Sequence, residues 1–250
     1  MNPLLHTRAL SAGHDTRVVL KDVDADLHEG ELVALIGVNG SGKSTLLRTL
    51  AGLRAPLSGE VLIKGEPLAS MSTAQRARMI SVVLTGKPRG GMLDVYTLVS
   101  LGRQPWTGRL GRLNEDDHRK VQEAMERTGI SRFAERSIHS LSDGESQMVM
   151  IARALAQDTP LMLLDEPTAF LDLVNRVKVM KLLRTIVHDT GKAALISTHD
   201  LHTAMEFSDR LMIIGGEGIW MGSPRAAIQE GILRMAFAEA GDMLFPTAST

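Results

Sequence analysis

A glycine-rich loop directly after an apolar strand constrains the fold of this chain more than any other feature. Five apolar residues, Leu32 to Ile36, lead into Gly37-Val38-Asn39-Gly40-Ser41-Gly42-Lys43-Ser44-Thr45, and a helix-compatible run continues to Leu50. The glycines let backbone N–H groups turn inward around phosphates, and the following helix presents its positive end. The lysine can reach β- and γ-phosphate oxygens, and the serine after it can bind Mg²⁺. The order of strand, loop and helix therefore predicts a phosphate-binding P-loop rather than a glycine-rich structural turn.

Length and composition indicate one active unit. The 250 residues are 44% hydrophobic and 23% charged, which suits one large α/β domain with or without a subdomain. With a formal net charge of −1 the chain has no excess positive charge to attract the phosphate backbone of DNA or RNA, so we expect no nucleic-acid partner. The absence of cysteine excludes disulfide frameworks, thiolate metal sites and cysteine nucleophiles.

The sequence shows no signal for export or membrane insertion. Its first fifteen residues lack a long apolar core behind a basic head, and no window reaches 18 consecutive apolar residues. We therefore expect the chain to stay in the cytoplasm and not to span a membrane by itself.

Apolar runs of strand length recur along the chain, at 32–36, 80–84, 161–164, 193–197 and 211–214. Unbroken apolar runs are typical of strands buried on both faces, and helix-period segments at 114–129 and 174–191 separate them. This alternation predicts an α/β fold with a parallel sheet. Because residues 86–157 hold two helical segments and no buried strand, we predict a sheet domain from 1–85 and 158–250 and a helical subdomain at 86–157.

Two adjacent carboxylates, Asp165 and Glu166, end the apolar run Leu161 to Leu164. Together with a P-loop, this pattern favours a division of labour. Asp165 would bind Mg²⁺ or its water, and Glu166 would orient and deprotonate the water that attacks a γ-phosphate. The alternative is an acidic helix cap before Pro167.

Two further segments have a structural and a functional interpretation. His199 follows the run 193–197, where it could sense a phosphate or simply satisfy nearby carbonyls while Asp200 caps the next helix. Ser142 and Glu145 have the spacing of a helix capping box. With the free N–H groups around Gly144, the same helix end could instead form a second anion site.

These four segments, in this order, resemble the nucleotide-binding subunit of ATP-binding cassette (ABC) transporters, and the resemblance covers nearly the whole chain. It implies a RecA-like P-loop NTPase core with an N-terminal antiparallel β subdomain and an inserted helical subdomain. It also implies that ATP and Mg²⁺ bind, and that Glu166, Lys43 and His199 are catalytic, with His199 as a switch that touches the γ-phosphate.

The resemblance further implies that a second copy of the chain completes the site. In the family two cassettes enclose two ATP molecules head to tail. Ser142, Gly144 and Glu145 of one copy would then face Lys43 of the other, and Asp172 would bridge the two sites at the dimer seam.

One segment resembles a particular branch of the family. Leu101-Gly102-Arg103-Gln104-Pro105-Trp106, followed by Gly111-Arg112-Leu113 and an acidic helix, is similar to cassettes of importers for ferric siderophores, haem and vitamin B12. This implies an ATPase at the cytoplasmic face of the membrane, bound to transmembrane permease subunits and serving a substrate-binding protein indirectly. The alternative is an ordinary surface turn. We expect Arg103, Arg109 and Arg112 to be solvated rather than to form a patch for headgroups or nucleic acid.

Three positions depart from the family pattern. Thr85 stands where a glutamine contacts Mg²⁺ and the attacking water, so we predict a bridging water or a weaker link to the helical subdomain. Asp143 replaces a glycine in the signature, where it either caps the helix outward or repels ATP. His14 replaces the aromatic residue that stacks on adenine, which predicts loose base discrimination.

Two other functions remain open, of which only the second is motivated by Thr85 and Asp143. One is a soluble cassette ATPase that acts in metallocofactor assembly or on nucleic acid or ribosomes. The other is a regulatory cassette that binds ATP with little hydrolysis. The remaining histidines show no metal-ligand spacing, and we interpret them as structural: His6, His28, His118, His139, His188 and His202.

Overall fold

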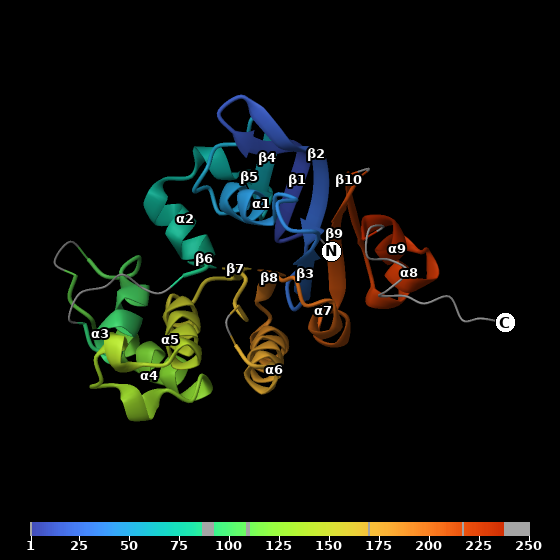
Figure 1. Cartoon of the computed structure of the whole chain (residues 1–250). Coiled ribbons are helices and arrows are strands. Elements are labelled where there is room, and N and C mark those ends of the chain that lie inside the picture. The colour runs from blue at the N-terminus through green and yellow to red at the C-terminus, as the bar shows by residue number, and fades with distance from the viewer. Residues whose placement is uncertain (1, 87–92, 109–110, 170, 217, 238–250) are drawn as a thin grey trace.

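Two β-sheets and the helices around them form the layers of this computed structural model (Figure 1). The structure describes residues 2–86, 93–108, 111–169, 171–216 and 218–237. The larger sheet has the strand order β10 (Gly218–Gly222), β9 (Arg210–Gly215), β3 (Leu32–Ile36), β8 (Ala193–Ser197), β7 (Leu161–Asp165) and β6 (Ile80–Val83). All neighbouring pairs are parallel except the edge pair β10–β9. The five predicted strands are confirmed, and β10 is an addition.

The smaller sheet is antiparallel and lies beside the first helix. Its strand order is β2 (Arg17–Leu27), β1 (Leu5–His14), β4 (Ser58–Ile63) and β5 (Glu66–Pro67). This sheet is the N-terminal β subdomain that the resemblance implied, and the α/β fold class is confirmed.

The predicted helices form where their capping signals stand. Asn114 caps α4 (Glu115–Arg127) in a capping box with Asp117, and α6 (Leu173–Thr190) ends at Gly191 in the left-handed conformation. Four helices were not predicted because they are too short for a clear apolar period: α2 (Thr73–Met79), α3 (Val95–Ser100), α8 (Pro224–Gln229) and α9 (Ile232–Ala236). The others are α1 (Lys43–Leu50), α5 (Asp143–Ala156) and α7 (Leu201–Phe207), with 3₁₀ turns at Leu68–Ser70, Leu101–Arg103, Ser131–Phe133 and Ile138–Ser140.

Between β6 and β7 the described residues form helices, turns and one isolated β-bridge between Asp94 and Ser137, with α3, α4 and α5 packed together. Figure 1 shows them as a group beside the main sheet. The limits of this subdomain at 85/86 and 157/158 stay a prediction. In the part of the chain that the structure describes, no helix is both long and apolar enough to cross a bilayer.

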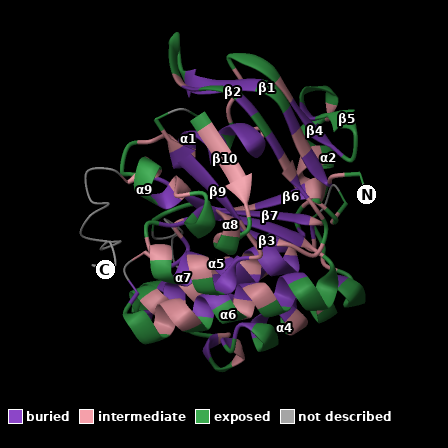
Figure 2. Ribbon diagram, turned by 90° about the vertical axis from the view of Figure 1, so that its right-hand side faces the viewer, coloured by how far each residue is buried: buried purple, intermediate pink, exposed green. Residues whose placement is uncertain are grey.

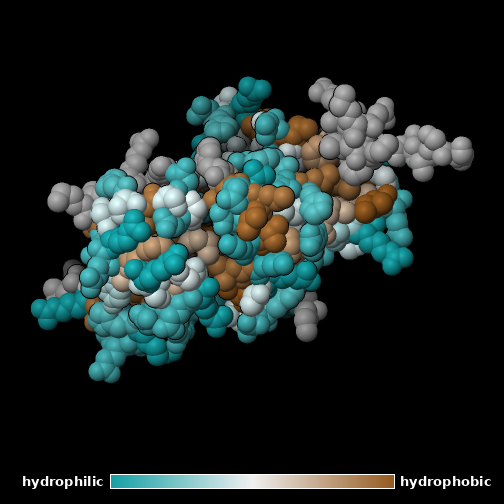
Figure 3. All heavy atoms as spheres, turned by 60° about the horizontal axis from the view of Figure 1, so that its bottom comes forward, coloured by the Kyte–Doolittle hydropathy of each residue, from teal (hydrophilic) through white to brown (hydrophobic). Residues whose placement is uncertain are grey.

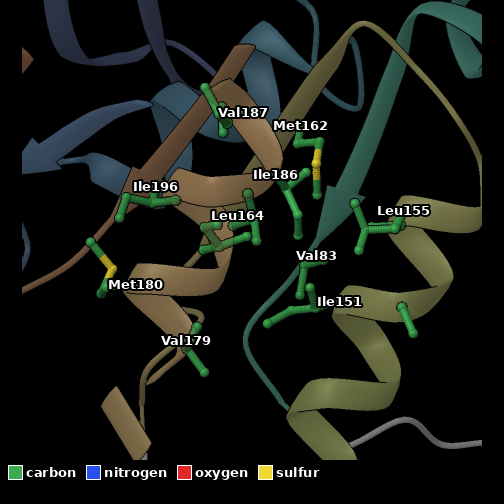
Figure 4. Close-up of a cluster of buried hydrophobic side chains, with 14 of the residues drawn as sticks. Val83, Ile151, Leu155, Met162, Leu164, Val179, Met180, Ile186, Val187 and Ile196 are labelled. Carbon is green, nitrogen blue, oxygen red and sulfur yellow. The ribbon is translucent and has the colours of Figure 1, made fainter. Parts of the chain in front are cut away.

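The parallel strands of the large sheet are buried on both faces, which explains their unbroken apolar runs, whereas the edge strand β10 is partly exposed (Figure 2). On β3, Val33 and Leu35 pack toward α1 and the small sheet, whereas Leu32, Ala34 and Ile36 pack toward the helical side. Figure 4 shows the helical side, where Ile151 and Leu155 of α5 and Ile186 of α6 meet the strands. The two cores fix the carboxyl ends of β3, β7 and β8 relative to each other.

One expectation about the surface is wrong. Arg103 is only 5% exposed, because its guanidinium donates from Nε to Asp117 Oδ1 at 2.8 Å and from Nη1 to the carbonyl of Ala156 at 2.9 Å. The acidic first turn of α4 thus neutralises a buried cation. Arg112 is exposed as expected, and Arg109 lies outside the described residues.

Candidate active site

The P-loop joins β3 to α1 through a backbone path that requires glycine. Gly40 and Gly42 have φ values of 79° and 103°, in the region that other residues rarely adopt. A Cβ on Gly42 would lie 2.7 Å from Val19, and one on Gly37 would lie 2.8 Å from Ser41 Oγ. The loop therefore wraps closely under strand β2.

Lys43 projects its ammonium group back across the loop. Its Nζ donates to the carbonyls of Gly37 at 2.8 Å and Val38 at 3.1 Å, and the residue is 6% exposed. Burial lowers the pKa of Lys43, while the charges of Glu166 and Asp165 raise it in opposition. Two carbonyls thus hold a desolvated cation at the mouth of the loop, where it can meet phosphate oxygens.

Asp165 at the end of β7 gathers two hydroxyl groups. Ser44 donates to its Oδ1 at 2.9 Å, and Ser197 donates to the same oxygen at 2.8 Å. Because the Ser44 hydroxyl donates its proton to the carboxylate, its oxygen lone pairs remain available to bind a cation. Among the described residues no hydrogen bond is made to Oδ2 of Asp165. Hard oxygen donors of this kind suit Mg²⁺.

Glu166 follows in a left-handed backbone conformation, with φ of 48°. Its N–H donates to Ser197 Oγ at 2.9 Å, and its carbonyl accepts from the N–H of Ala169 at 3.0 Å. His199 Nδ1 lies 3.8 Å from Glu166 Oε1. The structure thus brings the predicted base and the predicted switch histidine side by side.

A cavity of about 750 Å³ opens beside the P-loop and is lined by the predicted phosphate-binding residues of that loop other than Gly37. Residues 39–45 line it together with Glu166, His14 and the start of β2 at Arg17, Val18 and Val19. His14 Nε2 lies 3.1 Å from Thr45 Oγ1. The buried hydroxyl of Ser41 has no hydrogen-bond partner among the described residues. An open cavity of this volume, lined by an unpaired buried hydroxyl, a cation and the Glu166 carboxylate, with Asp165 bonded to Ser44 beside it, fits a metal-bound nucleotide.

The signature residues lie elsewhere on the chain. Ser142 caps α5: its Oγ accepts from the N–H of Glu145 at 3.3 Å, and Glu145 Oε2 accepts from Ser142 N at 2.8 Å. These hydrogen bonds from Ser142 lower the pKa of Glu145. Asp143 is exposed in the first turn, and Gly144 follows it. The capping box is confirmed, and none of these residues lines the cavity of their own chain.

Asp172 is the N-cap of α6 and accepts from the backbone N–H and side-chain amide of Asn175 at 2.9 and 2.8 Å. The next two residues, Leu173 and Val174, are 67% and 63% exposed. The predicted seam segment therefore presents apolar side chains to the surroundings beside a capped helix start.

Known proteins are similar to this chain in sequence and in fold. A family model described as "ABC transporter" matches residues 20–169. The chain is 35% identical to a petrobactin import ATP-binding protein of Bacillus anthracis, over 95% of this chain and 87% of that protein. It is 37% identical to an iron(3+)-hydroxamate import ATP-binding protein of Bacillus subtilis, over 93% and 87%. The chain belongs to the ABC transporter family.

The fold agrees with this membership. A solved ATP-binding cassette, dimeric in a post-hydrolysis state with ADP and phosphate, superposes with a TM-score of 0.77 at 29% identity, covering 88% of this chain and 99% of that one. The protein is thus an ABC ATPase: it binds ATP and hydrolyses it.

Thr85, the predicted departure from the family pattern at the metal site, contacts the backbone of the carboxylate pair. Its hydroxyl donates to the main-chain carbonyl of Asp165 at 2.9 Å, so the side chain is bonded to the backbone of the carboxylate pair. The predicted role of Thr85 at the metal stays a prediction, as do the roles of the other site residues.

Sequence reasoning missed Arg17, Val18 and Val19, which line the cavity, and Ser197, which bonds to the carboxylate pair. Ser197 is the one with a chemical contact to the predicted residues. It is the last residue of β8 and the only polar residue in that strand, paired in register with Asp165. A serine that ends an otherwise apolar strand was the available signal, and only the register shows that it adjoins the carboxylates.

Proposed function

We propose that this cassette hydrolyses MgATP to drive a membrane importer for an iron chelate or a corrinoid. The observation that carries the chemistry is the convergence of Lys43, Ser44 and Glu166 on one cavity. The relatives named for petrobactin and iron hydroxamate import favour an iron chelate as cargo.

The residues divide the work by their contacts. Ser44 and Asp165 would hold Mg²⁺, which supplies charge neutralisation at the phosphates when bound. Lys43 places its ammonium on the β- and γ-phosphate oxygens. Glu166 accepts a proton from water as the water oxygen bonds to the γ-phosphorus and the bond to the β–γ bridging oxygen breaks. His199, beside Glu166, donates to the transferred phosphoryl group.

A second copy completes each site in this proposal. Ser142, Gly144 and Glu145 of one chain would close on the ATP held by its partner, with Asp172 at the seam. The dimeric state of the solved cassette supports this arrangement, and so do the exposed apolar residues at the start of α6. Figure 3, with the lower side of Figure 1 brought forward, shows hydrophobic surface gathered in the middle between hydrophilic margins.

The membrane partners follow from the same relatives. Transmembrane permease subunits would hold the dimer at the cytoplasmic face of the membrane, and a substrate-binding protein would deliver cargo to them. The transported ligand itself would not touch this chain.

Phosphate release by the full-length chain and its Glu166→Gln variant tests the proposal, measured alone and with co-purified permease. We expect the variant to be slower by roughly 10²- to 10⁴-fold, because an amide cannot take the proton that the Glu166 carboxylate accepts, and to accumulate as an ATP-bound dimer. A near-normal rate would remove Glu166 from its role. Wild-type ATP binding without release, even with permease present, would favour a regulatory cassette, and full activity without a permease would favour a soluble ATPase.

A further inference from the structure

The carboxylate pair Asp165 and Glu166 is hydrogen-bonded by the side chain of Ser197. Ser197 is fully buried at the end of β8, and it lies opposite Asp165 of β7 on one side and Leu35 of β3 on the other. It does not line the P-loop cavity. Ser197 therefore lies within the sheet and outside the nucleotide cavity, but its hydroxyl contacts the two residues that the proposed reaction uses.

The hydroxyl of Ser197 both donates and accepts a hydrogen bond. It donates its proton to Asp165 Oδ1 at 2.8 Å and accepts the backbone N–H of Glu166 at 2.9 Å. Hydrogen bonds to a charged acceptor are stronger than those between neutral groups. One buried atom therefore fixes the carboxylate orientation of Asp165 and the peptide plane before Glu166.

Both of these groups need support. Oδ1 of Asp165 takes hydroxyl donors from Ser44 and Ser197, which leaves Oδ2 for a metal ion or its water. Glu166 holds φ at 48°, a conformation that a residue with a Cβ keeps only when its surroundings enforce it. The bond from its N–H to Ser197 supplies that constraint, and the turn directs Glu166 into the cavity.

We propose that Ser197 is a positioning residue for ATP hydrolysis, which acts by holding Asp165 and Glu166 in their working geometry. The proposal rests on the role of Glu166 given above. It assigns Ser197 to the chemical step and to metal affinity, and not to nucleotide affinity, because Ser197 lies outside the cavity.

The chain offers a matched control. Ser81 lies on β6 of the same sheet, is as deeply buried as Ser197, and its hydroxyl has no hydrogen-bond partner among the described residues. Ser197→Ala and Ser81→Ala therefore remove the same atom from the same sheet, and only the first removes contacts with the carboxylates. Ser197→Thr keeps the hydroxyl and is the conservative variant.

The test measures kcat, KM for ATP, the Mg²⁺ concentration for half-maximal activity and the thermal midpoint of each full-length variant. We expect Ser197→Ala to lower kcat roughly 10- to 100-fold, since a hydrogen bond to a charged group is lost, and to need more Mg²⁺. KM for ATP should stay within about twofold, because Ser197 does not line the nucleotide cavity. Ser81→Ala should match the wild type in kcat, and Ser197→Thr should recover most of the loss.

A folded Ser197→Ala chain with wild-type kcat and Mg²⁺ dependence overturns the proposal. If Ser197→Ala does not fold, the comparison moves to Ser197→Thr and Ser197→Cys, of which only the first keeps a strong donor. Equal kcat and Mg²⁺ dependence in these two also overturns it. Failure of the proposed function looks different, because Glu166→Gln would then keep its rate whatever Ser197 does.

Discussion

Thr85 shows how one residue can depart from a family pattern and still engage the same site. Its hydroxyl donates to the carbonyl of Asp165 from the β6 side of β7, while Ser197 holds Asp165 and Glu166 from the β8 side. The strand end that carries the carboxylates is thus bonded by both neighbouring strands. Thr85 lies two residues after the end of β6, and Ser197 is the last residue of β8.

Thr85→Val removes this hydroxyl without changing the size of the side chain. We expect kcat to fall by about 2- to 10-fold, the effect of one neutral hydrogen bond on the geometry of Asp165, with little change in thermal stability. Steady-state phosphate release is the measurement. Thr128→Val is the control, because that buried hydroxyl also donates to a carbonyl, in α4 and away from the cavity. Equal losses of kcat in both variants would show that Thr85 has no special connection to the site.

The residues that sequence reasoning placed at the site are those whose signals are local. Lys43 and Ser44 belong to one continuous motif, and Asp165 and Glu166 directly follow an apolar strand. Contacts made across strand register were beyond reach, because pairing of β8 with β7 joins positions 32 residues apart. The burial of Arg103 was mispredicted for the same reason, since Ala156 lies 53 residues away from it.

At the scale of elements, an ionic bridge ties α4 to the core sheet. Asp158 accepts from Lys192 Nζ at 2.7 Å and from Lys120 Nζ of α4 at 2.9 Å. Burial alone would raise the pKa of Asp158, but hydrogen bonds from the two lysines outweigh it and lower the pKa to about 2. The folded protein therefore binds this proton less readily than the unfolded chain does.

Asp158→Asn should make stability less dependent on acid pH. Because the pKa is depressed in the folded state, the contribution of Asp158 is fully present above about pH 4 and is lost as pH falls toward 2. We expect the variant to lose about 1 kcal/mol of unfolding free energy at pH 7, a value reduced because the carboxylate is one-third exposed. Urea unfolding at several pH values measures this.

The difference between Asp158→Asn and the wild type should shrink steadily below pH 4. Asp116→Asn is the control, because Asp116 pairs with exposed Arg119 on the same helix, and its effect should be smaller throughout. A gap between wild type and Asp158→Asn that persists unchanged at pH 2 would contradict the ionic bridge.

Helices were predictable in proportion to their length and caps. The 13-residue α4 and the 18-residue α6 carry several turns of apolar periodicity, whereas α2 and α3, with seven and six residues, do not. Helix α2 nevertheless has a capping box at Ser72 and Gln75, which local inspection could have found.

At the scale of the whole molecule, the two hydrophobic cores hold the P-loop residues and the signature residues Ser142, Gly144 and Glu145 apart within one chain. The proposed ATP site needs both sets of residues. The two cores fix the P-loop and the carboxylates at the carboxyl ends of β3 and β7, while Ser142 caps the start of α5 within the helical group. Sequence patterns predicted both sets, since each is a local motif. How the two sets meet across two chains is the central claim of this account.

Cross-linking between two differently tagged chains tests that claim most directly, because the natural chain has no cysteine. One chain carries Ser142→Cys, the other carries Asn39→Cys, and both carry Glu166→Gln so that bound ATP persists. With ATP and a mild oxidant, we predict a disulfide-linked species that contains both tags, which is absent without ATP and absent when either cysteine is omitted. ATP-bound chains that form no mixed product would contradict a site shared between two copies.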